Sequence, residues 1–228
     1  MRLSIVIPAL NEASALPGLL TSLAPWRRAG DEVVVSDGGS DDGTRDIAVA
    51  HGARVVDAPR GRARQMNAGA AVAAGDVLWF VHADSGVRQG LREGLAGAVA
   101  NGAVWGRFDV RLSGGGAALR MIAWSMNRRS RLTGIATGDQ GIFVRRALFE
   151  GVGGYPDQPL MEDVALSARL RREARPACLR GPLITASRRW ETHGVWRTVA
   201  LMWRLRFDYW RGADPHSLYR RYYRGESS

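Results

Sequence analysis

The sequence predicts an α/β protein with a mostly parallel sheet and helices on both of its faces. The first 85 residues alternate four strand-like apolar segments with three helical ones, a pattern typical of strands joined by right-handed crossovers. The segment 77–85, V-L-W-F-V-H-A-D-S, begins with five apolar residues, as expected for a strand buried on both faces. Acidic residues follow these strands, at the edge where α/β proteins bind ligands.

Each element of the first half has a local signal. The first strand ends at Pro8, which cannot donate to a sheet ladder. The loop 37–44 is acidic and glycine-rich and carries capping residues that open a helix. The predicted order is strand 3–8, helix 13–23, strand 32–36, a helix after residue 44, strand 54–57, helix 61–74 and strand 77–81.

The second half is less regular. Residues 104–112 alternate between apolar and polar types, as in a half-exposed strand. Glu162 and Asp163 begin a helical segment, where the helix dipole favours anions. The predicted order is helix 89–101, strand 104–112, helix 117–131, strand 141–145, helix 162–173, a short strand before residue 188, helix 195–210 and a basic-aromatic piece at 218–224.

Composition narrows the class of protein. The chain has 228 residues, a formal net charge of +10 and a single cysteine, Cys178. A lone cysteine excludes an internal disulfide and fits a reducing cytoplasm. No apolar run approaches the roughly 18–20 residues that span a bilayer, and the N-terminus fits a strand better than a secretory signal. We expect a cytoplasmic protein whose arginines suit a nucleotide diphosphate, a polyanion or an anionic membrane.

Two carboxylates follow strands whose ends should meet at one edge of the sheet. Asp37 can accept hydrogen bonds from a base or ribose, and Asp84 can hold a divalent metal over a diphosphate. Arg62 and Arg64, at a helix start between them, can contact the phosphates. An ordinary turn explains the acids of 37–42 without a ligand. No P-loop, GxGxxG or HExxH motif is present.

Five motifs in this order carry a resemblance to a known family. They are 8–12 (P-A-L-N-E), 36–44 (S-D-G-G-S-D-D-G-T), 64–69 (R-Q-M-N-A-G), 82–84 (H-A-D) and 161–163 (M-E-D). Together they resemble the family 2 glycosyltransferases with the GT-A fold, over about residues 3 to 190. Within that family the chain is similar to a small bacterial subgroup labelled arsenosugar-biosynthesis glycosyltransferases.

The resemblance implies a nucleotide-sugar donor, a UDP-sugar in the first place, and a divalent metal, Mn²⁺ or Mg²⁺. Asp84 is the last residue of the family's Asp-x-Asp metal motif, whereas His82 replaces its first Asp. An imidazole can still ligate a metal or bond a ribose hydroxyl, and His193 is a further candidate ligand. The implied donor-binding residues are Pro8, Asn11, Glu12, Asp37, Gly38, Arg62, Arg64, Asn67, His82, Ala83 and Asp84.

The resemblance also implies an inverting transfer. Asp163, paired with Glu162, is the implied general base that deprotonates the acceptor. Without the family, both acids are equally well explained as partners of the helix dipole. Ala186 stands where processive members have a glutamine, which argues against processivity. The residues implied to contact the acceptor or sugar are Asp139, Gln140, Arg189 and Trp190.

We expect one GT-A domain at 1–194, with a nucleotide-binding half at 1–85 and an acceptor and catalytic half at 86–194. A basic-aromatic helical extension follows at 195–228. Its tryptophans recur at helical spacing among arginines, which fits a helix lying on an anionic inner membrane surface and equally one packed on the core or on a second copy. The expected partners are the donor, a small-molecule acceptor and, through this extension, a membrane or a homodimer.

A second function class stays open at this point. A basic α/β protein can bind nucleic acid or an anionic membrane surface without catalysis. Acids gathered at strand ends would repel such a polyanion, which favours the enzyme and argues against nucleic acid as a partner. A sugar-phosphate nucleotidyltransferase is disfavoured, because its glycine-rich loop with a catalytic lysine is absent.

Overall fold

A computed structural model describes residues 1–187 and 194–223. The described residues form one seven-stranded sheet, with strands β1 (Leu3–Ala9), β2 (Glu32–Asp37), β3 (Arg54–Asp57), β4 (Val77–Phe80), β5 (Trp105–Leu112), β6 (Phe143–Arg145) and β7 (Ala177–Thr185). Their order is β3-β2-β1-β4-β6-β5-β7. β6 runs antiparallel to β4 and β5, and the other pairs are parallel. The predicted α/β fold is therefore confirmed, and β1, β2 and β4 end at the same edge.

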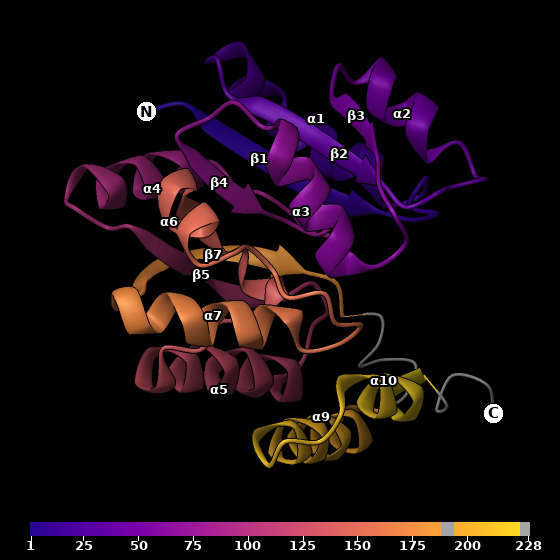
Figure 1. Cartoon of the computed structure of the whole chain (residues 1–228), viewed down its shortest axis with the longest axis vertical. Helices are drawn as coiled ribbons and strands as arrows, with labels where there is room; N and C mark the ends of the chain where they lie inside the picture. The colour runs from indigo at the N-terminus through magenta and orange to yellow at the C-terminus, as the bar shows by residue number, and fades with distance from the viewer. Residues whose placement is uncertain (188–193, 224–228) are drawn as a thin grey trace.

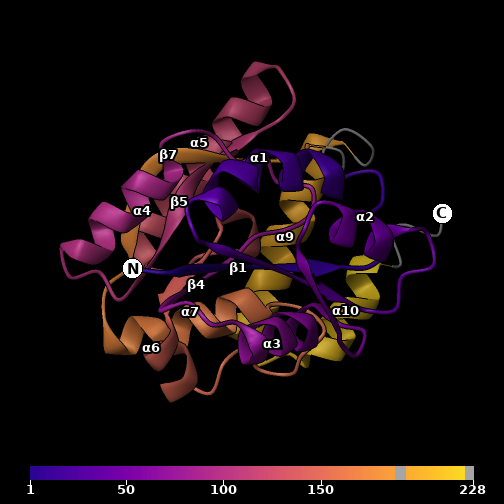
Figure 2. The same cartoon turned by 90° about the horizontal axis from the view of Figure 1, so that it is seen from above.

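Helices cover both faces of this sheet, as the view from above in Figure 2 shows. They are α1 (Leu16–Arg28), α2 (Thr44–Ala50), α3 (Arg62–Val72), α4 (Leu91–Ala100), α5 (Ala117–Thr133), the short 3₁₀ helix η1 (Gly138–Gln140), α6 (Arg146–Gly151), α7 (Glu162–Glu173), α9 (Val195–Trp210) and α10 (Pro215–Tyr223). The cores of the two faces are separate: α1, α2 and α4 contribute to one, and α3, α6 and α7 to the other.

β4 is anchored by a large aromatic residue. Trp79 is fully buried and stacks on Trp26 of α1, with ring centroids 5.0 Å apart. Its indole N–H donates to the Gly141 carbonyl at 3.1 Å, so its polar atom is satisfied inside the core. His82 and Asp84 follow directly after β4, so the anchored strand sets their position at the edge of the sheet.

Two predictions about elements were wrong, and one helix was missed. α1 begins at Leu16 rather than Ala13, because the N–H groups of residues 15 and 16 both donate to the Glu12 carbonyl and form a turn there. α6 was not predicted. β5 is almost entirely buried rather than half-exposed, because it lies between β6 and β7 and α5 packs on it. Arg107 of β5 is fully buried and donates to the Asn127 carbonyl of α5 at 3.0 Å.

Gly69 is where α3 comes very close to the sheet. A Cβ atom there would lie 2.4 Å from Ser36 Oγ and 2.5 Å from Val6 Cγ1. We expect Gly69→Ala to lower the free energy of unfolding by about 1–3 kcal/mol, measured by urea denaturation. Gly97→Ala in α4 is the matched control, since its Cβ would meet no atom within 4 Å; helix propensity predicts a gain of up to about 1 kcal/mol. Equal losses in both variants would contradict the packing argument.

The C-terminal helices α9 and α10 lie beyond α5 and α7, away from the N-terminal half of the sheet (Figure 1). Leu205 and Leu218 are buried against Leu160 and Met161, which directly precede α7, and α9 also packs on α5. One face of α9 thus packs on the core, as one of the interpretations expected. Among the described residues, no helix has both the length and the apolarity to cross a membrane. The domain boundaries at 85 and 194 remain proposals.

Candidate active site

A cavity of about 460 Å³ lies beyond the end of β4, at the N-terminal ends of α3 and α7 and against α9 and α10. Polar and charged side chains from segments far apart in the sequence line it. Six of the sequence-predicted site residues are brought together here: Arg62, His82, Asp84, Asp139, Glu162 and Asp163. The fold therefore joins the predicted metal motif to the predicted base.

Asp163 is held in place by the backbone of η1. Its Oδ2 accepts a hydrogen bond from the Gly138 N–H at 2.7 Å. A Cβ atom at Gly138 would lie 2.6 Å from His82 Nε2, so these three residues meet at one wall of the cavity. Met161, which precedes α7, has a left-handed backbone (φ 65°), uncommon for a residue with a side chain. The turn at Met161 brings the α7 N-terminus to the cavity.

Glu162 is a buried acid beside a cation. Its side chain is 3% exposed, and its Oε1 lies 3.7 Å from Arg62 Nη1. Burial, with repulsion from Asp163, raises the pKa of Glu162 to about 7, although Arg62 acts in the opposite direction. Burial would lower the pKa of Arg62, but Glu162 and other nearby groups raise it. Arg62 is therefore a cation that lines the cavity beside Glu162.

Glu162 should make stability depend on pH. The unfolded chain loses this proton near 4.5, whereas the folded protein keeps it to about pH 7. Unfolding between these values releases a proton, so Glu162 lowers the free energy of unfolding progressively as the pH rises, by up to roughly 3 kcal/mol. We expect Glu162→Gln to remove this pH dependence. Urea denaturation at about pH 5 and about pH 8, near the two ends of that window, should show the free energy of unfolding of the variant rising relative to that of the native protein. Parallel pH profiles of the two proteins would contradict this.

His82 and Asp139 are neighbours in the cavity, with His82 Nδ1 3.7 Å from Asp139 Oδ1. Burial, followed by repulsion from Arg62, lowers the pKa of His82 to about 4, so the ring is neutral at pH 7. Burial also raises the pKa of Asp139, although its side chain is 46% exposed toward the cavity that it lines. At neutral pH the contact is therefore not an ion pair.

The predicted metal ligands, Asp84 and His82, suit a cation that is shared with a substrate. Asp84 is exposed and lines the cavity. Among the described residues, no cluster of three or more His, Cys, Asp or Glu side chains can hold a metal by itself. Mg²⁺ is commonly bound by one or two carboxylates together with substrate phosphates. The residues therefore fit a metal held jointly with a diphosphate, and they do not form a closed protein site within the described part of the chain.

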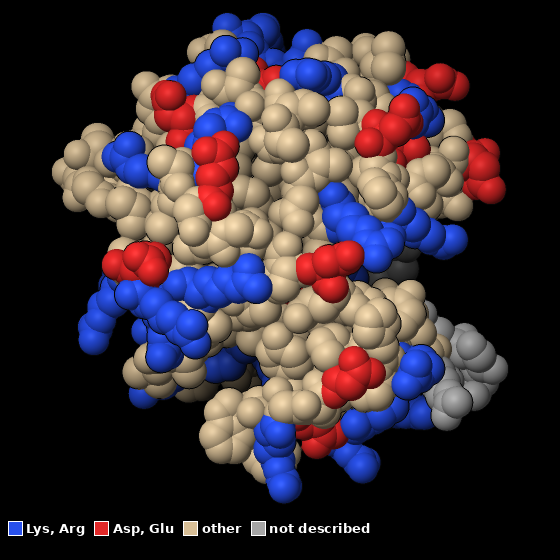
Figure 3. Space-filling model, in the orientation of Figure 1, with Lys and Arg blue, Asp and Glu red and all other residues tan. Residues whose placement is uncertain are grey.

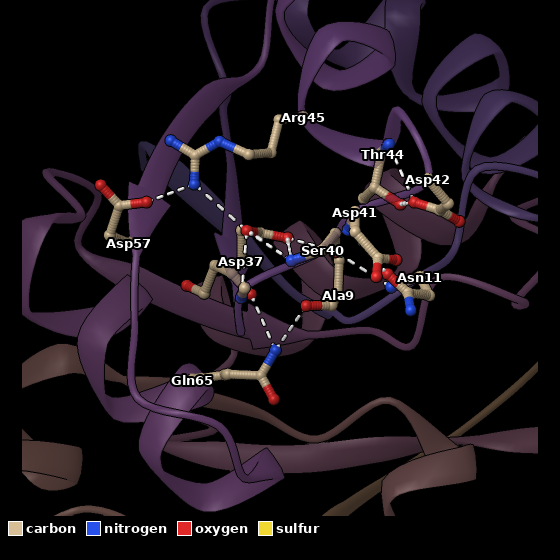
Figure 4. Close-up of polar contacts among 12 residues, drawn as sticks. Ala9, Asn11, Asp37, Ser40, Asp41, Asp42, Thr44, Arg45, Asp57 and Gln65 are labelled. Carbon is tan, nitrogen blue, oxygen red and sulfur yellow. Dashed lines mark hydrogen bonds and ion pairs between the residues drawn. The ribbon is translucent and has the colours of Figure 1, made fainter.

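Asp37 organises the loop that follows β2 (Figure 4). Its fully buried side chain accepts hydrogen bonds from the Gly39 N–H at 3.1 Å, from Ser40 and from Arg45 Nη1 at 3.1 Å. Burial would raise the pKa of Asp37, but the hydrogen bonds from Ser40, Arg45 and Gly39 outweigh it and lower the pKa. Asp37 thus anchors the turn, and a contact with a base stays a prediction.

The loop after β1 is tied to this same turn. Asn11 has a left-handed backbone (φ 56°), and its Oδ1 accepts from the Asp41 N–H at 3.0 Å. The Glu12 N–H donates to Thr44 Oγ1 at 2.8 Å. The predicted nucleotide-binding residues of the two loops are therefore joined to each other by hydrogen bonds, but they do not line the cavity.

Gln65 of α3 is a residue that the sequence did not single out as a site residue. Its amide donates to the carbonyls of Ala9 at 2.6 Å and Ser36 at 3.0 Å, which joins the ends of β1 and β2. Gly38 lies directly against this side chain, and Pro8 is buried opposite Ser36 in the sheet. Pro8 and Gly38 thus shape the strand ends without lining the cavity.

Two residues that were predicted to contact the nucleotide-sugar donor instead bond to other groups of the protein. Arg64 forms a two-pronged pair with Asp157, at 2.8 and 3.0 Å. The Asn67 amide donates to the Tyr155 carbonyl at 2.8 Å and accepts from the Tyr155 N–H at 3.0 Å. Neither residue lines the cavity, so the structure places them as braces of the loop before α7.

Two further predicted site residues are buried, and their contacts with donor or sugar stay predictions. Ala83 is 2% exposed and belongs to the core. Gln140 is fully buried, and its Oε1 accepts from the Thr137 N–H at 3.2 Å, so it caps η1. The predicted residues Arg189, Trp190 and His193 lie outside the described residues.

The sequence did not predict that the C-terminal helices form one wall of this cavity. Arg206 and Met202 of α9 and Tyr222 of α10 line the cavity, as does Thr185 at the end of β7. None belongs to a local motif. Their position follows from the packing of α9 on the residues before α7, a long-range contact that the helical pattern of α9 cannot indicate.

The family model of glycosyl transferase family 2 matches residues 4–150. The chain belongs to glycosyl transferase family 2. It is 32% identical over 170 residues to the PGL/p-HBAD biosynthesis glycosyltransferase of Mycobacterium tuberculosis, covering 67% of this chain and 62% of that protein. It is 33% identical over 92 residues to the glucosyl-3-phosphoglycerate synthase of the same species, covering 36% of this chain and 28% of that one. The family 2 chain therefore spans less than two thirds of these relatives.

Solved structures share the fold of this family 2 chain. The crystal structure of S. aureus TarS 1–349 matches with a TM-score of 0.69 at 20% identity, over 82% of this chain and 61% of that one. Glucosyl-3-phosphoglycerate synthase from M. tuberculosis, in complex with Mn²⁺, UDP and glucosyl-3-phosphoglycerate, matches with a TM-score of 0.61 at 22% identity, over 81% and 70% of the two chains. These matches support the GT-A fold of the family.

Proposed function

We propose that this family 2 member is an inverting glycosyltransferase that moves a sugar from a UDP-sugar to a small acceptor. The observation that carries the proposal is the hydrogen bond between Asp163 and Gly138, which fixes a carboxylate in the same cavity as Asp84 and Arg62. A base, a diphosphate anchor and a cation are what sugar transfer from a nucleotide requires. Structures of S. aureus TarS with UDP and with UDP-GlcNAc support the choice of nucleotide.

In the proposed reaction Asp163 takes the proton of the acceptor hydroxyl while the acceptor oxygen attacks the anomeric carbon. The new carbon–oxygen bond forms as the bond to the diphosphate oxygen breaks, and UDP leaves with that electron pair. Attack from the side opposite to the leaving group inverts the anomeric configuration. Arg62, a cation that lines the cavity, stabilises the charge that develops on the diphosphate.

Asp84, with His82 beside it, is proposed to hold Mn²⁺ or Mg²⁺ together with the diphosphate. When bound, the cation stabilises the negative charge of the leaving group. Glucosyl-3-phosphoglycerate synthase was crystallised with Mn²⁺ and with Mg²⁺, in each case with UDP. Asp139, which lies 3.7 Å from His82, stays the proposed sugar or acceptor contact, and His193 stays a candidate ligand.

The finer predictions about partners are proposals too. Cytoplasmic location, contact with an anionic membrane, homodimer formation and the resemblance to the arsenosugar subgroup are predictions from the sequence alone. The alternative, a binder of nucleic acid, has less support. On the face drawn in Figure 3, arginines are interspersed with acidic residues rather than gathered in one basic patch, whereas a polyanion binder concentrates its cations on one surface.

The proposed function is tested by the nucleotides that bind. Thermal shift and calorimetry with UDP, GDP and CDP, each with and without Mn²⁺, should show stabilisation by UDP with Mn²⁺, of about 2.7 kcal/mol when the ligand is at a hundred times its Kd. The corresponding UDP-sugars then identify the sugar. No stabilisation by any nucleotide, together with tight binding of a random RNA, would favour the binding protein instead.

A further inference from the structure

A second cavity of about 610 Å³ lies between α5 and α9. Its walls are largely apolar, and three of its tryptophans are strongly exposed: Trp124 at 61%, Trp196 at 67% and Trp203 at 69%. Large apolar side chains rarely gather on the surface of a protein unless they bind something. We call this space the α5–α9 groove.

The groove continues into the candidate active site. Asp139, Met202 and Arg206 line both cavities, so a molecule in the groove has one end beside the proposed acceptor contact. Because of this continuity, we treat the groove as an extension of the active site rather than as an independent binding surface. It also explains why the wall of the active site is built from α9, the helix that forms the other side of the groove.

The junction between the two cavities holds two arginines, Arg129 and Arg206, whose charge Asp139 and Asp163 oppose from the active-site side. Arg129 Nε and Nη2 and Arg206 Nε are inaccessible to solvent and have no hydrogen-bond partner among residues 1–187 and 194–223. Burial lowers the pKa of Arg129 to about 10 and also lowers that of Arg206. Both are still cations at neutral pH, and buried guanidinium groups without full partners favour an incoming anion.

We propose that the α5–α9 groove binds the apolar chain of an amphipathic acceptor whose anionic head lies at Arg129 and Arg206. The inference rests on the proposed function and narrows its acceptor class. The apolar walls match an alkyl or isoprenoid chain, and the arginines match a phosphate or carboxylate head. A flat membrane surface would engage Trp210 as well, which is 80% exposed and lies outside the groove, so a comparison of Trp203 with Trp210 distinguishes the two occupants.

The probe is n-decyl phosphate, used below its micelle concentration and measured by calorimetry. Inorganic phosphate and vesicles of phosphatidylcholine with phosphatidylglycerol serve as comparisons. Trp203→Ala removes a groove residue, and Trp210→Ala removes a tryptophan of the same helix that is also strongly exposed but lies outside the groove. Arg206→Gln and Arg204→Gln form the matching pair for charge, since Arg204 lines neither cavity. UDP binding is measured in every variant.

We expect n-decyl phosphate to bind more tightly than inorganic phosphate. Trp203→Ala and Arg206→Gln should each weaken it by about tenfold, and the two control variants should not. Equal losses in Trp203→Ala and Trp210→Ala, with binding to vesicles only, would replace the proposal with membrane contact. A dimer that Trp203→Ala dissociates would replace it with self-association. Failure of the alkyl probe while UDP still binds overturns this inference alone, whereas failure of UDP overturns the proposed function.

Discussion

Asp163→Asn is expected to lower turnover by about 10²–10⁴-fold, the usual contribution of a general base, while UDP binding is unchanged. Asparagine has the same shape and retains an oxygen that can accept the Gly138 N–H. The loop and the N-terminus of α7 should therefore keep their positions. The amide cannot take a proton from the acceptor, so the loss should appear in the chemical step rather than in donor binding.

This prediction can be measured before the acceptor is known. Slow hydrolysis of the UDP-sugar uses water as the acceptor and needs the same base, so release of UDP reports on Asp163. Asp157→Asn is the matched control: the substitution is identical, but Asp157 is 63% exposed and pairs with Arg64 outside the cavity. Near-normal turnover of Asp163→Asn would mean that another group is the base, or that the acceptor reacts as an anion and needs none.

Much of the fold could be predicted from the sequence, because β1, β2 and β4 bury both faces and so appear as continuous apolar runs. The same rule failed for β5. Its sequence alternates because Arg107 is paired inside the protein rather than exposed to solvent, and an alternating pattern cannot distinguish a paired buried arginine from a solvated one. Arg107 pairs with Asp109 of its own strand and donates to the Asn127 carbonyl of α5, a contact that only the tertiary structure supplies.

Part of the candidate site could also be predicted from the sequence. Asp84 and His82 follow directly from the end of β4, and Asp163 from the start of α7. By contrast, Arg64 and Asn67 belong to the right motif but face the loop before α7. Position in a helix sets which face a side chain lies on, but only tertiary packing decides what that face meets. Arg206 is the opposite case: it belongs to no motif, yet the packing of α9 places it at the cavity.

Asp84→Ala is expected to abolish the metal-dependent part of UDP binding. In the native protein Mn²⁺ should strengthen UDP binding, because the cation joins the carboxylate to the diphosphate. In the variant, UDP should bind equally with and without Mn²⁺, and the native stabilisation of about 2.7 kcal/mol at a hundred times Kd should fall to the small value given by UDP alone. Thermal shift with both ligands measures this without any activity assay.

Asp46→Ala is the matched control, because Asp46 is an exposed acid on α2 that does not line the cavity. It should respond to Mn²⁺ as the native protein does. Equal metal effects in Asp84→Ala and the native protein would exclude Asp84 as the anchor. The replacement of the family's first aspartate by His82 makes this test decisive: with one carboxylate fewer in the motif, Asp84 is the only anionic ligand that the motif offers, and no second carboxylate in it can compensate for the loss.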